Sequence, residues 1–360
     1  MSSHPDVGLF IDGTWRETAD SLPVVNPANE QVIGRVSCAG RQDLDDALEA
    51  AAKGFKVWRA TAPRDRAGIL RAAAALLRRR QDEIARDITL EHGKPYRQAR
   101  LEVIRGCEFF EWDAGEAVRA YGRVIPSGPG VHYIVQRQPI GSVAALSPWN
   151  FPMSQPARKV AGAVAAGCSI ILKPSEETPA GAMHIARAFA DAGLPPGVLN
   201  LVFGVPSEIS EHLIPHEVIR LVAFTGSTAV GRRLSALAAE AMTPVLMELG
   251  GHAPVIVCED TDARAAAVSS AVRKMRNAGQ VCTSPTRFFV HETIFEEFLD
   301  VFTERAAATV VGDGMEPGVE MGPLANDRRV AALTELVADA RERGATVTTG
   351  GERIGTSGYF

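Results

Sequence analysis

The chain has 360 residues and a formal charge of −5, with 46% hydrophobic and 22% charged residues. This length suggests two or three domains, and the composition is typical of globular proteins and argues against disorder. No run of about 18 apolar residues occurs, which predicts no transmembrane helix, and residues 1–15 lack a secretory signal pattern. The 43 acidic against 38 basic side chains argue against binding to nucleic acid or an anionic membrane.

The N-terminal third predicts two hairpins separated by helices. A short hairpin is expected over 8–16, turning at Asp12-Gly13, because this dipeptide favours tight turns. Apolar residues at helical spacing predict helices at about 41–58, 64–91 and 95–118. Residues 121–139 hold two β-prone runs around a Pro/Gly-rich turn, which indicates a hairpin arm too small to bury itself.

From residue 140 the pattern becomes an alternation of strands and helices, which predicts an α/β fold with a parallel sheet covered by helices on both faces. A second, shorter alternation follows, and the chain then ends on Tyr359-Phe360 after a glycine-rich loop, which suggests an incomplete domain. The predicted strands are 142–146, 169–173, 198–203, 219–225, 245–249, 253–258, 287–291 and 345–349; the predicted helices are 152–166, 179–192, 206–214, 228–241, 262–278, 293–309 and 326–343.

Five widely spaced cysteines, with no C-x-x-C pair, are typical of a reducing cytoplasm and argue against a disulfide framework or zinc site. Cys38, Cys107, Cys168 and Cys258 fall in apolar or helical stretches and are expected to be inert core residues. Cys282 instead follows a helix in a Gly/Thr/Ser/Pro-containing loop, which makes it a candidate nucleophile. No cluster of His, Cys and Asp has metal-ligand spacing, so no metal is predicted, and a Cys–His dyad stays open.

Two segments at predicted strand ends have the chemistry of a nucleotide site. Residues 226–231 follow a strand and open a helix, where free N–H groups and the helix dipole favour an anion. Arg232-Arg233 follow, which excludes a P-loop but leaves phosphate binding or a simple tight turn. Lys173 and Glu176 follow another strand, where they are either ribose ligands or two solvated loop charges.

Two further residues are candidates for catalysis. Asn150 lies between two prolines that fix its backbone, so its amide is either an oxyanion donor or a turn cap. Glu248 lies within an apolar strand, where burial would raise its pKa and suit it to general-base work. The structural alternative is a buried glutamate with a partner.

Taken together, these segments closely resemble the NAD(P)-dependent aldehyde dehydrogenase family over about residues 9–360. Five motifs, in order along the chain, carry the resemblance: Pro148-Trp149-Asn150-Phe151-Pro152, Lys173-Pro174-Ser175-Glu176, Phe224-Thr225-Gly226-Ser227-Thr228, Glu248-Leu249-Gly250-Gly251 and Gly279-Gln280-Val281-Cys282. The resemblance implies a Rossmann-type dinucleotide-binding domain over 1–120 and 140–250, an oligomerisation arm at 121–139, and part of a catalytic domain at 251–360. Family members extend further, so the chain is expected to be truncated at its C-terminus.

The resemblance also implies roles for individual residues. Cys282 would attack the aldehyde carbon, Asn150 and the Cys282 backbone N–H would hold the oxyanion, and Glu248 would activate the water that hydrolyses the thioester. Glu176 would favour NAD because a carboxylate repels a 2′-phosphate, with NADP also possible. The implied cofactor-binding residues are Trp149, Lys173, Glu176, Thr225, Gly226 and Ser227.

The substrate expectation depends on two arginines. Residues 248–254, with His252, and residues 350–355 look most like the succinate- and 2-oxoglutarate-semialdehyde dehydrogenase branch. Arg158 and Arg276 match positions at which two arginines hold the substrate carboxylate in succinate-semialdehyde dehydrogenases, and an arginine fork suits a carboxylate. The alternative for each is a surface charge or a salt bridge. The implied enzyme oxidises a carboxylate-bearing semialdehyde, is cytoplasmic and forms a homo-oligomer in its full-length form. Two other functions stay open: a cysteine esterase using Cys282 and Glu248, and a truncated subunit that binds only nucleotide or a partner.

Overall fold

The computed structural model describes residues 4–360, and its contacts divide the chain into two compact units. The first unit comprises the described residues up to 24 together with 34–85 and 100–249, and the second comprises 25–33, 86–99 and 250–360. The segments 25–33 and 86–99 therefore belong to the second unit, although they fall within the dinucleotide-binding domain expected over 1–120 and 140–250.

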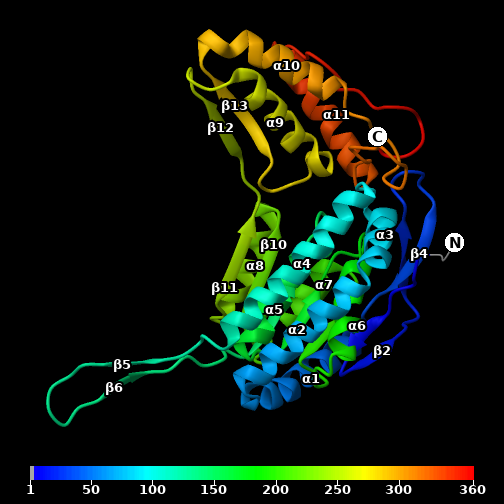
Figure 1. The fold of residues 1–360 in the computed structure, drawn as a ribbon. Helices are drawn as coiled ribbons and strands as arrows, with labels where there is room; N and C mark the ends of the chain where they lie inside the picture. Colours follow the sequence, from blue (N-terminus) through cyan, green and yellow to red (C-terminus); the bar gives the residue numbers. More distant parts are fainter. Residues whose placement is uncertain (1–3) are drawn as a thin grey trace. The chain divides into compact units, whose positions relative to one another are not determined.

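The order of elements follows the alternation predicted from the sequence (Figure 1). The strands are β1 (Leu9–Ile11), β2 (Thr14–Arg16), β3 (Ser21–Val25), β4 (Val32–Ser37), β5 (Arg123–Ile125), β6 (Tyr133–Val135), β7 (Ser142–Leu146), β8 (Ile170–Lys173), β9 (Leu199–Leu201), β10 (Ile219–Gly226), β11 (Val245–Leu249), β12 (Ala253–Val257) and β13 (Pro285–Val290). The α-helices are α1 (Arg41–Ala60), α2 (Pro63–Arg79), α3 (Gln81–His92), α4 (Tyr96–Ala117), α5 (Ser154–Ala166), α6 (Ala180–Asp191), α7 (Pro206–Leu213), α8 (Thr228–Glu240), α9 (Ala263–Met275), α10 (Phe295–Ala307) and α11 (Asp327–Glu342), with short 3₁₀ turns η1 (Arg276–Gly279) and η2 (Glu292–Ile294).

A seven-stranded sheet in the order β11-β10-β7-β8-β9-β1-β2 forms the centre of the first unit. The five strands β7 to β11 are parallel, and β1 and β2 add an antiparallel edge. Every residue of β7 and β8 is buried, as expected for the apolar central strands of a parallel sheet.

The strand order reverses direction at β7. From β7 the chain adds β8 and β9 on one side, and then returns to place β10 and β11 on the other side. Right-handed crossovers therefore put α5 and α6 on one face of the sheet and α7 and α8 on the opposite face. Helix α2 packs on α5 and α6, while α1 contacts α7. The adjacent carboxyl ends of β7 and β10 form the switch point where ligands of open α/β sheets bind.

The second unit contains a parallel pair, β12 and β13, packed on α9 and α10. Its apolar cluster includes Val257, Ala267 and Phe298. The rings of Phe288 and Phe302 meet edge to face with centroids 5.3 Å apart, which is a favourable geometry for an aromatic pair.

The α/β fold class is confirmed, as are both predicted hairpins and the five strands from 142 to 249. The single helix predicted over 64–91 is wrong, because α2 ends at Arg79 and α3 begins at Gln81. Strands β3 and β4 had not been predicted. The strand predicted at 345–349 is also wrong: the stretch is β-prone, but it pairs with no strand within the described chain.

The expectation that four cysteines lie in the core is correct only for Cys107 and Cys168. Cys258 is exposed because it directly follows the last residue of β12, and Cys38 is partly exposed after the end of β4. Burial raises the pKa of the Cys107 thiol to about 12, which makes this thiol inert.

One close backbone contact gives a test of packing in the first unit. A methyl group at Gly54, within α1, would lie 2.2 Å from the carbonyl carbon of Gly197. We expect Gly54→Ala to lower the free energy of unfolding by about 1–3 kcal/mol, measured by urea denaturation. The matched control is Gly68→Ala in α2, where no atom lies within 4 Å and helix propensity predicts up to about 1 kcal/mol of stabilisation. Equal effects of the two variants would show that the approach of Gly54 to Gly197 does not restrict the size of the residue at this position.

Candidate active site

The carboxyl edge of the parallel sheet gathers the candidate residues of the first unit. Asn150 lies in the turn after β7, Lys173 ends β8, Thr225 and Gly226 end β10, and Glu248 lies near the end of β11. Because the strands are parallel, their carboxyl ends share one edge of the sheet. The topology therefore brings together side chains that are up to 98 positions apart in sequence.

The turn that carries Asn150 is fixed at both ends. The Thr178 hydroxyl donates to the Trp149 carbonyl at 3.2 Å. On the other side, the Glu102 carboxylate accepts from the backbone N–H groups of Met153 and Ser154 at 2.9 and 3.0 Å. A carboxylate at the start of α5 complements the helix dipole. Glu102 had not been singled out from the sequence, because its partner lies about fifty residues away.

Lys173 and Glu176 form an ion pair through Glu176 Oε1, and Lys173 is only 5% exposed. The same oxygen accepts from the backbone N–H of Gly204 at 3.2 Å. Burial lowers the pKa of Lys173, and the attraction of Glu176 opposes that shift. The alternative of two independent solvated charges is therefore wrong: the two side chains form one fixed pair after β8.

A lysine not singled out from the sequence, Lys159 on α5, is a second base with a lowered pKa at this edge. Its Nζ donates to Thr225 Oγ1 at 2.9 Å. Burial lowers its pKa to about 8, and attraction from Glu248 opposes the shift. The sequence cue was a single lysine followed by the apolar run Val160–Ala166, an arrangement that favours a partly desolvated ammonium.

The expected burial of Glu248 is wrong, because its side chain is exposed. The reason is topological: β11 is the edge strand of the seven-stranded sheet, and the pattern of β11 alternates between exposed and half-buried positions at Met247, Glu248 and Leu249. Glu248 still lies close enough to Lys159 to favour the protonated form of the lysine.

The glycine-containing segment after β10 opens α8 as predicted. Ser227 is the N-cap, and its hydroxyl accepts from the Val230 N–H at 3.4 Å. A Cβ at Gly231 would lie 2.5 Å from the Leu249 side chain, so this glycine permits close packing of α8 on β11. The exposed start of α8 keeps the free N–H groups that an anion requires.

Cys282 belongs to the second unit, where it is exposed in the loop between η1 and β13. The residues before it adopt a left-handed turn, with φ of 53° at Asn277, 53° at Ala278 and 73° at Gly279. Non-glycine residues in this region cost about 1–2 kcal/mol each. The Gln98 side chain accepts from the Asn277 N–H at 3.2 Å and so helps to hold the turn.

The two arginines expected to bind a carboxylate lie in different units. Arg158 is exposed on α5, next to Lys159, and its guanidinium lies 4.2 Å from the centroid of the Phe109 ring. Arg276 is exposed at the end of α9 in the second unit. Neither position is buried.

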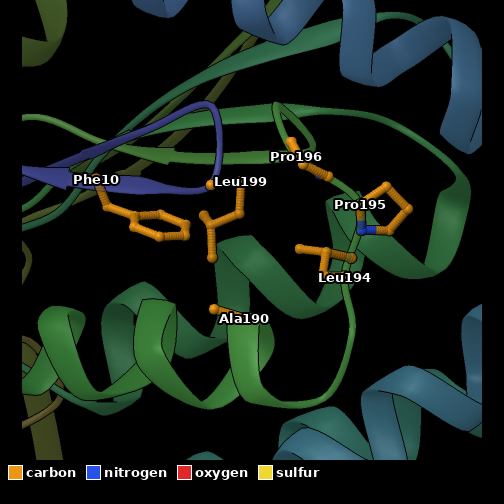
Figure 2. A pocket seen from close by; sticks show the side chains of 7 residues that line it. Phe10, Ala190, Leu194, Pro195, Pro196 and Leu199 are labelled. Atoms are coloured by element: carbon orange, nitrogen blue, oxygen red, sulfur yellow. The ribbon is translucent and has the colours of Figure 1, made fainter.

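A small pocket of the first unit lies away from these residues (Figure 2). It is next to Leu199, the first residue of β9, and therefore at the opposite end of the strands from the candidate site. The residues that line it carry no ionisable side chain: Phe10, Gly13, Ala190, Leu194, Pro195, Pro196 and Leu199. This pocket consequently offers no group for acid–base or nucleophilic chemistry.

Within residues 4–360, no group of three or more His, Cys, Asp and Glu side chains is arranged to hold a metal ion. In the same part of the chain, no helix is both long and apolar enough to cross a membrane.

Comparison with known proteins identifies the family to which this fold belongs. The profile of the aldehyde dehydrogenase family matches residues 15–360. The 4-(hydroxymethyl)benzenesulfonate dehydrogenase TsaD1 of Comamonas testosteroni is 42% identical over 98% of this chain and 74% of its own length. The succinate semialdehyde dehydrogenase of Acinetobacter baylyi is 38% identical over 98% of this chain and 73% of its own length.

A solved structure gives the same result. The NAD⁺ complex of an aldehyde dehydrogenase from Bacillus cereus superposes with a TM-score of 0.96 and 34% identity, over 99% of this chain and 74% of that one. The chain belongs to the aldehyde dehydrogenase family and is an oxidoreductase. It spans about three quarters of the length of these relatives.

The attraction between Lys159 and Glu248 predicts a measurable titration. We expect the Lys159 amine to titrate near pH 8 in an NMR experiment on ¹³C-methylated lysines, assigned with Lys159→Arg; the chain has only six lysines. Glu248→Gln should lower this pKa further, because it removes the charge that favours the ammonium. Glu240→Gln, an exposed substitution at the end of α8, is the control. A Lys159 pKa near 10.5 would contradict the burial of the amine.

Proposed function

We propose that this chain oxidises an aldehyde that carries a carboxylate or sulfonate group, with NAD as the hydride acceptor. The observation that carries the proposal is the shared carboxyl edge of β7, β8, β10 and β11, which presents Asn150, Lys173, Thr225 and Glu248 together. The family relationship supplies the reaction class. The names of the two relatives above supply the anionic groups, a sulfonate in one and the carboxylate of succinate semialdehyde in the other.

The proposed chemistry assigns one task to each residue. The Cys282 thiolate attacks the aldehyde carbon, while its backbone N–H and the Asn150 amide stabilise the oxyanion. NAD, when bound, accepts the hydride that leaves the adduct. Glu248 then takes a proton from the water that hydrolyses the thioester, and its exposed position gives water access to it. Lys159, hydrogen-bonded to Thr225 and attracted to Glu248, supports the proton transfer.

The residues present fit a dinucleotide. The Glu176 carboxylate is held in place by Lys173 and the Gly204 N–H through Oε1, so we assign Oε2 as the acceptor for an adenosine ribose hydroxyl. Ser227 and the start of α8 would contact the pyrophosphate, with Gly226 and Thr225 at the adjoining strand end and Trp149 across the switch point. The negative charge of Glu176 favours NAD over NADP.

The anionic end of the substrate is assigned to Arg158 and Arg276. Both guanidinium groups are exposed, and such forks bind carboxylates and sulfonates through paired N–H donors. Succinate semialdehyde is the four-carbon test compound of this class.

We further propose that the β5–β6 hairpin binds a second copy of the chain. All six residues of its strands are exposed, and they include Val124 at 69% and Ile134 at 64% exposed. A two-stranded hairpin with exposed apolar side chains is not stable by itself and gains stability from a partner. We assign the enzyme to the cytoplasm, in keeping with its free thiols.

The nucleophile test separates oxidation from simple ester hydrolysis. We expect Cys282→Ala to lower NAD reduction with succinate semialdehyde, followed at 340 nm, by at least about a thousandfold, with NAD affinity by calorimetry unchanged. Cys258→Ala, at another exposed thiol of the same unit, is the control. Ester turnover by the parent chain with no NAD reduction would reject the proposal and favour a cysteine esterase.

The cofactor preference depends on one charge. We expect Glu176→Gln to raise the ratio of kcat/KM with NADP to that with NAD by about tenfold, because the carboxylate no longer repels a 2′-phosphate. Glu177→Gln changes the adjacent carboxylate and serves as the control. An unchanged ratio in Glu176→Gln would place the ribose site elsewhere.

A further inference from the structure

One face of α4 lies along α5, the helix that carries Arg158. The residues concerned, Glu102, Gly106, Phe109 and Asp113, are spaced by four, three and four positions, which puts them on one helical stripe. Each meets α5 in turn: Glu102 accepts from the first N–H groups, Gly106 faces the Met153 and Ala157 side chains, and Asp113 faces Gly162. Phe109 meets the guanidinium of Arg158.

Gly106 lies where α4 meets the start of α5. A Cβ at this position would lie 3.0 Å from the Met153 side chain, so the absence of a side chain lets α5 approach α4 at this point. Further along the stripe, Phe109 contacts Arg158 and Asp113 faces Gly162.

Arg158 has an aromatic partner on α4, whereas two other arginines pair with glutamates of the same helix. Arg78 pairs with Glu111 at 2.8 Å, and Arg119 pairs with Glu116. Within the described residues 4–360, no carboxylate oxygen lies within 4.0 Å of the Arg158 guanidinium. Asp113 attracts Arg158 only over a longer range.

The Arg158 guanidinium lies over the Phe109 ring and makes no hydrogen bond or ion pair within residues 4–360, so its N–H donors are available. The cation–π contact uses the planar face of the group, whereas carboxylates and sulfonates bind to the edge through parallel N–H donors. The Phe109 ring thus restricts the orientation of the guanidinium without occupying its hydrogen-bond donors, which a salt bridge would do.

We propose that Phe109 is a positioning residue for substrate selection, which holds Arg158 as a receptor for the terminal carboxylate or sulfonate of the aldehyde. This inference rests on the proposed function. The preference for anionic aldehydes then depends on an aromatic ring of α4 that itself donates no hydrogen bond to the substrate.

The test compares anionic aldehydes with neutral partners of similar size. Succinate semialdehyde is paired with butanal, and 4-formylbenzenesulfonate with benzaldehyde. The quantity measured is the ratio of kcat/KM for the anionic member to that for the neutral member. We expect Phe109→Leu to lower this ratio about fivefold for at least one pair, mainly through KM of the anion, since an exposed cation–π contact is of this strength. Phe109→Tyr, which keeps the aromatic ring, should have the same ratio as the parent chain.

Two further variants separate the possible failures. Phe55→Leu removes a ring that lies 5.4 Å from Arg59 on α1, and it should leave the ratio as in the parent. Arg158→Met should lower the ratio more than Phe109→Leu does, and combining the two should add no further loss. An unaffected ratio in Arg158→Met would reject the proposed role of Arg158 itself. If Arg158→Met lowers the ratio but Phe109→Leu does not, the role of Phe109 is rejected and that of Arg158 stands. The same conclusion follows if Phe109→Leu lowers the ratio and Phe109→Tyr lowers it as well.

Discussion

Parallel pairing of β7 with β8 and β10, and of β10 with β11, is the constraint on which the rest of the site depends. Each crossover helix returns the chain to the same end of the sheet, so the five parallel strands, these four among them, end on one edge. The central strands β7 and β8 are buried, and polar side chains collect at and beyond the carboxyl ends of the strands, where ligands of such sheets bind. The pairing of Val222 with Ala144 and Val245 thereby decides which loop residues become neighbours.

The charges that the fold buries at this edge are compensated one by one. Lys173 has Glu176, Lys159 has the Thr225 hydroxyl and the field of Glu248, and the Glu102 carboxylate has two backbone N–H groups. Removal of any such partner would leave a desolvated polar or charged group, which costs more than the bond itself contributes. The same compensation holds these side chains in single orientations, which a binding site needs.

Most of the sheet and the strand ends could be predicted from the sequence, because runs such as Ser142–Leu146 and Val245–Leu249 are strongly apolar and regularly spaced. The exposure of Glu248 could not, since the position of a strand within a sheet is set by long-range pairing. Lys159 and Phe109 were missed for a related reason: their partners, Thr225 and Arg158, lie 66 and 49 positions away in the sequence. The break at Arg80 also lacks a local cue, because neither glycine nor proline stands there.

The contact between Gly54 and Gly197 limits which substitutions can occur together at these two positions in related proteins. Each glycine faces the backbone of the segment that holds the other, and a Cβ at Gly197 would lie 2.2 Å from the Ala50 carbonyl oxygen. A larger residue at one position cannot be accommodated by a smaller one at the other, because both are already the smallest residue. Compensating substitutions at the two positions are therefore not expected. Methods that recover contacts from covariation will therefore not detect the contact of Gly54, in α1, with Gly197, in the segment preceding β9.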